Sequence, residues 1–183
     1  MPTSHLVLGG ARSGKSRFAL SIQPAPGRVA FVATAEAGDA DMAARIARHQ
    51  AERSPRWLTV EEPRALVAAL ERLADRADAV LVDCLTLWVA NRLLGGDSDA
   101  AIVEDTDALT ALIGRGRYDL TLVSNEVGEG VHPPTEQGLR FRDLLGLVNQ
   151  RVAAACDRVT LMVAGLPLTI KASAPYDVTL QAP

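Results

Sequence analysis

The sequence predicts a single-domain α/β fold with a mostly parallel sheet flanked by helices. Short apolar runs alternate with longer helical patterns, an order that is typical of parallel sheets. The length of 183 residues suits one domain. A glycine-rich segment, "GGARSGKS", follows the first apolar run directly and precedes a helical pattern. These three observations favour one nucleotide-binding catalytic domain over residues 1–183.

Six short runs rich in aliphatic and β-branched residues are the predicted strands. Several are apolar at nearly every position, which is typical of strands covered on both faces. They occupy residues 5–10, 28–35, 57–62, 79–86, 120–127 and 158–165.

Helical patterns separate these strands. Gly95 and Gly96, followed by "DSD", predict a surface loop in the middle of the chain. Residues 172–183 are predicted to form a loose tail or a short edge strand. The predicted helices cover residues 15–23, 39–53, 64–76, 99–113 and 136–156.

Composition and charge exclude several classes of partner. The formal net charge is −3, so the chain lacks the basic excess that typifies nucleic-acid binding. The apolar runs are too short to span a bilayer, and the N-terminus lacks the features of a signal peptide. Cys84 and Cys156 are far apart in apolar surroundings, as expected of reduced, buried thiols. We therefore expect a soluble, cytoplasmic protein with no nucleic-acid partner and no membrane insertion.

The segment from residue 9 to residue 16 matches the phosphate-binding loop pattern G-x-x-x-x-G-K-[ST]. Glycines let the backbone curl so that its N–H groups point at phosphate oxygens. Lys15 is expected to reach the β and γ phosphates, and the Ser16 hydroxyl to ligate Mg²⁺. The pattern and its context predict a nucleotide site.

A magnesium site also needs a carboxylate at the end of a strand that neighbours the phosphate loop. Asp83 closes the run "AVLVD" and is the predicted partner of Ser16. Capping the following turn is the alternative role for Asp83. Glu61 and Glu62 end another strand and are weaker candidates, with ordinary solvated acids as their alternative.

One helical segment, residues 39–53, carries a polar stripe. On a helix, Asp41, Arg45, His49 and Arg53 recur every four residues and share one face. Neighbouring arginines favour the neutral imidazole, which is a nucleophile, and could hold the phosphate that it attacks. The alternative is an exposed helix with salt bridges and a histidine that has no function.

The loop predicts a nucleotide but no particular reaction. A guanine-specific switch protein would carry N-K-x-D, and the nearest string, "SNEVG" at 124–128, lacks both the Lys and the Asp. A small-molecule kinase without a covalent step and a non-catalytic nucleotide-binding protein both stay open at this point. Asn125 and Glu126 end a predicted strand, where open α/β sheets place ligands, although turn formation explains them equally well.

The sequence resembles the bifunctional adenosylcobinamide kinase / adenosylcobinamide-phosphate guanylyltransferase family. The arginine inside the phosphate loop, the R-I-x-x-H stretch and N-E-V-G-x-G are more specific than the loop alone. The matching segments keep the family's order over most of the chain, at residues 9–16, 33–35, 41–53, 82–91, 124–133 and 141–165.

The resemblance implies a RecA-like P-loop NTPase fold, a homotrimer and two reactions. A nucleoside triphosphate, ATP or GTP, would phosphorylate adenosylcobinamide in the presence of Mg²⁺. GTP would then guanylylate an enzyme histidine, and the GMP would pass to adenosylcobinamide phosphate to give adenosylcobinamide-GDP.

The resemblance also assigns roles to residues of this chain. His49 would be the guanylylated histidine; some relatives have two adjacent histidines here, whereas this chain has Arg48 before His49. His132, in "GEGVHPP", is a weaker candidate for contact with substrate. Lys15 joins His49 as a catalytic residue, and Ser16 and Asp83 are the metal ligands. The expected nucleotide-binding residues are Gly9, Gly10, Ala11, Arg12, Ser13, Gly14, Lys15, Ser16, Thr34, Arg53, Glu61 and Asp83.

Overall fold

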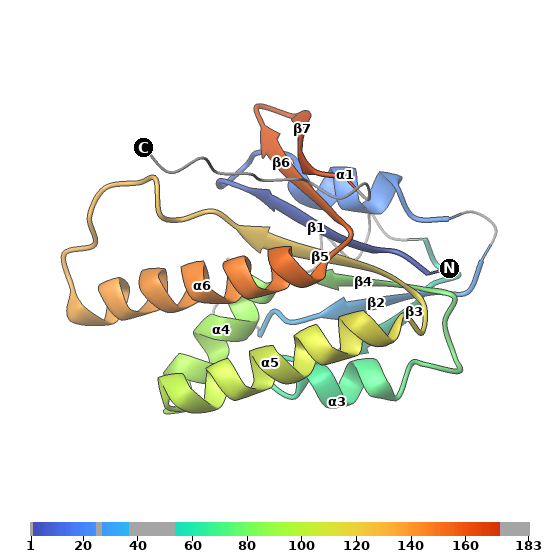
Figure 1. Cartoon of the computed structure of the whole chain (residues 1–183), viewed down its shortest axis with the longest axis horizontal. Coiled ribbons are helices and arrows are strands. Elements are labelled where there is room, and N and C mark those ends of the chain that lie inside the picture. Colours follow the sequence, from blue (N-terminus) through green and yellow to red (C-terminus); the bar gives the residue numbers. More distant parts are fainter. Residues whose placement is uncertain (1, 25–26, 37–53, 173–183) are drawn as a thin grey trace, which may run out of the picture.

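The computed structural model describes residues 2–24, 27–36 and 54–172. These residues form one seven-stranded sheet in the order β3-β2-β4-β5-β1-β6-β7. Neighbouring strands are parallel except β6 and β7, which pair antiparallel at one edge. Helix α1 covers one face, and α3, α4, α5 and α6 cover the other (Figure 1). The predicted α/β class with a mostly parallel sheet is confirmed.

The six predicted strands are all present. Their apolar runs are buried where helices cover both faces, so that every residue of β2 is buried. Their bounds are β1 Ser4–Gly9, β2 Val29–Ala33, β3 Leu58–Glu61, β4 Ala79–Asp83, β5 Asp119–Asn125 and β6 Arg158–Val163.

Helices α1, α5 and α6 begin and end close to the predicted positions, and α3 is shorter than predicted. Helix α5 begins after Ser98, whose hydroxyl accepts a hydrogen bond from Ala101 N at 3.2 Å. It ends at Gly116, which adopts a left-handed φ of 54°. Thr135 caps α6 in the same way as Ser98. The bounds are α1 Lys15–Ser21, α3 Leu66–Glu71, α5 Asp99–Arg115 and α6 Glu136–Ala155.

Two elements differ from the prediction. The strand predicted over residues 79–86 ends at Asp83, and helix α4 follows at Leu85–Leu94. A continuous apolar run has no period that separates a buried strand from a buried helix, so the boundary was misplaced. The second unpredicted element is strand β7, Leu166–Lys171, which precedes the tail predicted at 172–183. The predicted helix at 39–53 and residues 173–183 lie outside the described residues.

Two hydrophobic clusters hold the layers together. The larger one lies between the sheet and helices α3 to α6 and contains the fully buried Trp88. The smaller one packs Ala19 of α1 against Val7, Phe31 and Val123 of the sheet. Each such side chain contributes about 1.5–3 kcal/mol when fully buried, so the larger cluster dominates.

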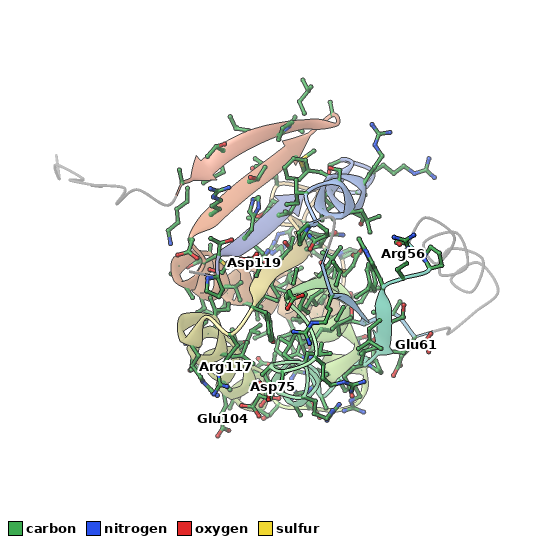
Figure 2. All side chains as sticks on the ribbon, turned by 90° about the vertical axis from the view of Figure 1, so that its right-hand side faces the viewer. Arg56, Glu61, Asp75, Glu104, Arg117 and Asp119 are labelled. Atoms are coloured by element: carbon green, nitrogen blue, oxygen red, sulfur yellow. The ribbon has the colours of Figure 1, made fainter. Side chains whose placement is uncertain are left out.

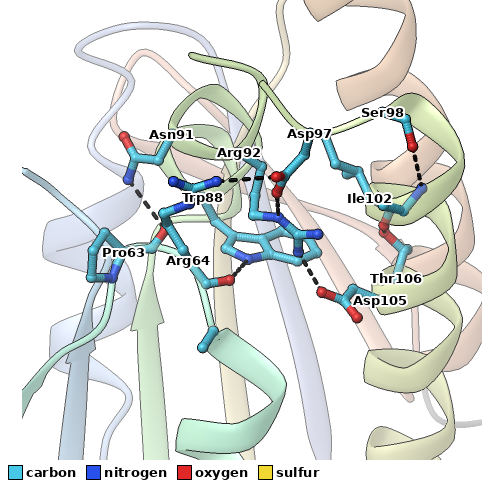
Figure 3. A network of polar contacts seen from close by, with 12 residues as sticks. Pro63, Arg64, Trp88, Asn91, Arg92, Asp97, Ser98, Ile102, Asp105 and Thr106 are labelled. Atoms are coloured by element: carbon cyan, nitrogen blue, oxygen red, sulfur yellow. Dashed lines mark hydrogen bonds and ion pairs between the residues drawn. The ribbon is translucent and has the colours of Figure 1, made fainter. Parts of the chain in front are cut away.

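A buried arginine fixes the connection between α4 and α5 (Figure 3). Arg92 pairs with Asp97 in the connecting loop and with Asp105 on α5. Its guanidinium carbon lies 5.8 Å from the centroid of the Trp88 ring. Trp88 Nε1 in turn donates a hydrogen bond to the Arg64 carbonyl at 2.8 Å. The network joins α4, α5 and the segment that follows β3.

Replacing Arg92 by leucine is expected to destabilise the fold by roughly 2 kcal/mol, because Asp105 loses its partner and Asp97 keeps only its ion pair with Arg64. Urea unfolding followed by circular dichroism measures this. Arg151→Leu is the matched control, because Arg151 pairs with Asp107 on the surface, where both side chains are at least 36% exposed. The control should change stability by about 0.5 kcal/mol or less. Equal losses in the two variants would contradict the special role of Arg92.

Candidate functional site

The phosphate loop, Gly9 to Ser16, joins the end of β1 to the start of α1. Gly9 lies against β6, and a Cβ there would come within 2.8 Å of the Met162 carbonyl oxygen. Gly14 adopts a left-handed φ of 90°, which other residues adopt with strain. The two glycines of the motif are therefore required by the backbone path.

Gly14 is also the N-cap of α1, and no side chain caps this helix end. The first N–H groups of a helix need partners, and phosphate oxygens are suitable ones. Lys15 is only 9% exposed, and its Nζ donates a hydrogen bond to the Gly10 carbonyl at 3.1 Å. The loop thus holds its lysine folded back over its own backbone.

The turn between β6 and β7 packs against the phosphate loop. Gly165 N donates a hydrogen bond to the Ser13 carbonyl at 3.0 Å. A Cβ on Gly14 would lie 3.3 Å from the Gly165 Cα. The Ser13 hydroxyl is buried and makes no hydrogen bond within the part of the chain that the structure describes. Nothing in the sequence pattern indicated this support, because the hairpin lies about 150 residues away along the chain.

The acidic candidates lie at the same edge of the sheet but on different strands. Asp83 ends β4 and Glu61 ends β3, and each pairs with Ala33 at the end of β2. The prediction that Asp83 lies on a strand adjacent to the phosphate loop is wrong, because β5 separates β4 from β1. With strands about 4.8 Å apart, the end of β4 lies about 10 Å from β1 and the end of β3 about 19 Å. Asp83 is thus the nearer carboxylate, and Glu61 lies towards the outer edge (Figure 2).

Thr34 lies directly after β2 and is fully buried. Its hydroxyl donates to the Cys84 carbonyl and accepts from Cys84 N, both at 2.7 Å. The Thr34 carbonyl accepts a hydrogen bond from Asn91 Nδ2, also at 2.7 Å. The buried Thr34 hydroxyl therefore has a structural role, because its two hydrogen bonds join the end of β2 to the end of β4.

The end of β5 lies between the phosphate loop and Asp83. Asn125 pairs in register with Gly9, and Glu126 N donates a hydrogen bond to the Gly9 carbonyl at 3.1 Å. In the sequence, two polar residues follow an apolar run, and this pattern predicted Asn125 and Glu126 at the end of a strand. It did not reveal their contact with the loop, which depends on strand order.

The histidine candidates are divided between described and undescribed parts of the chain. His49 and Arg53 lie outside the described residues. His132 is exposed, and its Nδ1 lies 3.0 Å from Arg142 Nη1. This contact gives His132 a partner on helix α6 near the surface.

Mg²⁺ prefers hard oxygen ligands and keeps several waters and phosphate oxygens in its coordination shell. The Ser16 hydroxyl at the start of α1 and the Asp83 carboxylate at the end of β4 supply that chemistry. One hydroxyl and one carboxylate suffice when phosphates complete the shell. These two residues fit the metal.

Cys84, directly after β4, is a further potential nucleophile at the same edge of the sheet. Burial, followed by the charge of Asp83, raises the pKa of its thiol to about 11, and the nearby Lys15 charge lowers it only partly. The thiolate is the reactive form, so Cys84 is a poor nucleophile at neutral pH.

Comparison with known proteins identifies the family. The model of the CobU family, described as cobinamide kinase / cobinamide phosphate guanyltransferase, matches residues 5–170. The chain belongs to this family. Membership makes it an enzyme, and the relatives below are named as bifunctional.

Three curated relatives have the name bifunctional adenosylcobalamin biosynthesis protein. The CobP protein of Pseudomonas aeruginosa is 46% identical over 167 residues, covering 91% of this chain and 96% of the relative. The CobU proteins of Salmonella typhimurium and Escherichia coli are 40% and 38% identical over 178 residues, covering 91% of this chain and 98% of each relative. The similarity to this chain thus extends along nearly the whole length of each of these relatives.

A solved structure supports the fold. The chain is similar to a prototypical ATPase from the type III secretion system of pathogenic bacteria, with a TM-score of 0.55 and 12% identity. The similarity covers 91% of this chain and 56% of that one. At this identity the similarity supports the α/β fold alone. Among the described residues, no helix is long and apolar enough to cross a membrane.

Replacing Lys15 by methionine is expected to weaken GTP binding at least tenfold, because the buried ammonium is lost from the phosphate site. Titration with a fluorescent GTP analogue measures this. The chain has one other lysine, Lys171, whose Nζ caps the end of α6 at the Ala153 and Ala154 carbonyls. Lys171→Met is therefore the matched control and should bind GTP as tightly as the parent protein. Undiminished GTP binding by K15M would refute the assignment.

The two buried thiols should resist alkylation in the folded protein. Burial raises the pKa of Cys156 to about 12, as it raises that of Cys84. At pH 8 we expect iodoacetamide to modify the native protein at least about 100-fold more slowly than the urea-unfolded chain, since the thiolate fraction falls tenfold per pKa unit. Peptide mass spectrometry over time measures both sites. Rapid native modification of Cys84 would make it a rival nucleophile.

Proposed function

We propose that this protein phosphorylates adenosylcobinamide with ATP or GTP and then transfers GMP from GTP to adenosylcobinamide phosphate. The observation that carries the proposal is the complete phosphate loop, with its lysine buried and its helix end uncapped, in a chain of the CobU family. The polar end of β5 beside the loop and the carboxylate at the end of β4, one strand farther away, supply the groups that phosphoryl transfer needs.

In the kinase step, the loop amides and Lys15 hold the triphosphate and stabilise the charge that develops on the γ-phosphoryl group. Ser16 and Asp83 would hold Mg²⁺, which neutralises phosphate charge when bound. The cobinamide hydroxyl attacks the γ-phosphorus, and a nucleoside diphosphate leaves.

In the transferase step, His49 attacks the α-phosphorus of GTP and pyrophosphate leaves. The phosphate loop holds the leaving β and γ phosphates, and Arg53 contributes charge to the nucleotide. The P–N bond of the guanylylated histidine is labile enough to release GMP to the second substrate, so one difficult transfer becomes two easier ones. The raised pKa of the Cys84 thiol supports a nucleophile other than cysteine.

A simple kinase without a covalent step is the second candidate. The buried lysine and the strand-end carboxylate serve that reaction equally well. The predicted homotrimer and the predicted cytoplasmic location stay predictions.

The deciding experiment incubates the protein with Mg²⁺ and GTP labelled in the α-phosphate. We expect an acid-labile, base-stable GMP adduct that peptide mass spectrometry places on His49. His49→Ala should abolish the adduct while retaining kinase activity on adenosylcobinamide. His132→Ala is the control and should form the adduct at the normal rate. Protein that binds GTP but never carries label would establish the simple kinase, and an adduct on His132 would move the site.

A further inference from the structure

Glu126 is joined to the phosphate loop by the backbone. It follows directly after β5, and its N–H extends the β5–β1 ladder by donating to the Gly9 carbonyl at 3.1 Å. Neighbouring strands lie about 4.8 Å apart, and β5 is a neighbour of β1. Glu126 therefore lies at the end of a strand directly beside the one that leads into the loop. Asp83 lies one strand farther away, and Glu61 lies three strands farther.

Buried polar side chains fix the peptide immediately before Glu126. Asn125 N donates to Thr86 Oγ1 at 2.7 Å, and the Asn125 carbonyl accepts from Asn149 Nδ2 at 3.0 Å. Asn149 Oδ1 itself accepts from Ser124 Oγ at 2.7 Å. Thr86, Ser124 and Asn149 are all less than 9% exposed. A fully bonded buried network of this kind is rigid, so Glu126 leaves the sheet at a fixed point.

The Glu126 carboxylate is oriented by a hydrogen bond but forms no ion pair with a described arginine or lysine. Its Oε1 accepts a hydrogen bond from Gly128 N at 2.7 Å. Within the described part of the chain, no arginine or lysine forms an ion pair with it, and Oε2 has no hydrogen-bond partner. The side chain is partly exposed at the carboxyl ends of the strands, where a substrate approaches. An oriented carboxylate with a free oxygen can accept a proton.

We propose that Glu126 is the general base of the kinase step. As the substrate hydroxyl oxygen forms its bond to the γ-phosphorus, the hydroxyl proton passes to the Glu126 carboxylate. The bond between the γ-phosphorus and the β,γ-bridging oxygen breaks, the nucleoside diphosphate leaves, and Glu126 later releases the proton to water. Phosphoryl transfer to an alcohol uses such a carboxylate to orient the nucleophile and accept its proton. The assignment rests on the proposed kinase activity.

Glu126 is chosen over Asp83 and Glu61 because of its distance from the phosphate loop and because Asp83 is assigned to the metal. Asp83 would instead hold Mg²⁺ together with the Ser16 hydroxyl, because it ends the second strand from the loop and is farther than Glu126 from β1. Glu61 lies about 19 Å from β1 and is outside hydrogen-bond reach of a hydroxyl at the γ-phosphate. Glu126 lies beside the loop and has an oxygen available.

The test compares Glu126→Gln and Glu126→Asp with Glu129→Gln, a matched control because Glu129 is exposed on the same loop. With adenosylcobinamide and ATP, E126Q should lower kcat by about 10²- to 10³-fold and leave the KM for ATP within about threefold. The acid limb of the wild-type pH profile should disappear in E126Q. E126D should recover part of the rate, and E129Q should match the wild type.

Kinase activity, GMP-adduct formation and GTP binding, measured side by side, distinguish a catalytic role of Glu126 from a structural one. E126Q should bind a fluorescent GTP analogue normally and form the GMP adduct at the wild-type rate. An E126Q variant with unchanged kcat would overturn the base assignment, as would equal losses of kinase activity, GTP binding and adduct formation, which indicate a purely structural role. Wild-type protein that does not phosphorylate adenosylcobinamide would overturn the proposed function and the base assignment with it.

Discussion

The parallel ladder between β1 and β5 is the interaction on which the rest of the site depends. It runs from Ser4 opposite Leu120 to Gly9 opposite Asn125, and the Glu126 amide extends it by one more bond. Through this ladder the phosphate loop and the polar end of β5 share a single rigid edge. Because β4 pairs with the other side of β5, the position of Asp83 relative to the loop is fixed by the same strand.

Local signals in the sequence predicted most of the elements, because each has a local physical cause. Gly9, Gly14 and Lys15 define the loop by backbone conformation and charge, and buried parallel strands appear as apolar runs. Helix α4 was missed because its first residues continue the apolar run of β4. Strand β7 was missed although Gly165 is a turn residue, because Pro167 lies inside its run and proline argues against a strand.

Strand order was the part of the site that local reasoning could not supply. Asp83 ends an apolar strand, and that fact alone suggests a neighbour of the phosphate loop. The position of β5 between β4 and β1 is a property of the whole sheet, which no single segment of the sequence reveals. Thr34 illustrates the same limit, since its hydroxyl is used by the Cys84 peptide rather than exposed to the site. The residue type of Thr34 and Asp83 indicated that each side chain is polar, whereas the tertiary structure determines which group each side chain contacts.

The contact between Gly165 and the phosphate loop has a consequence for the order in which the protein becomes functional. The first motif of the chain is completed by almost the last described turn, because Gly165 N binds the Ser13 carbonyl and β6 must pair with β1 before that turn can form. A chain still being synthesised therefore carries the loop sequence from the outset but acquires its supported shape only after residue 165 has left the ribosome. The supported shape of the loop thus depends on β6 already lying beside β1.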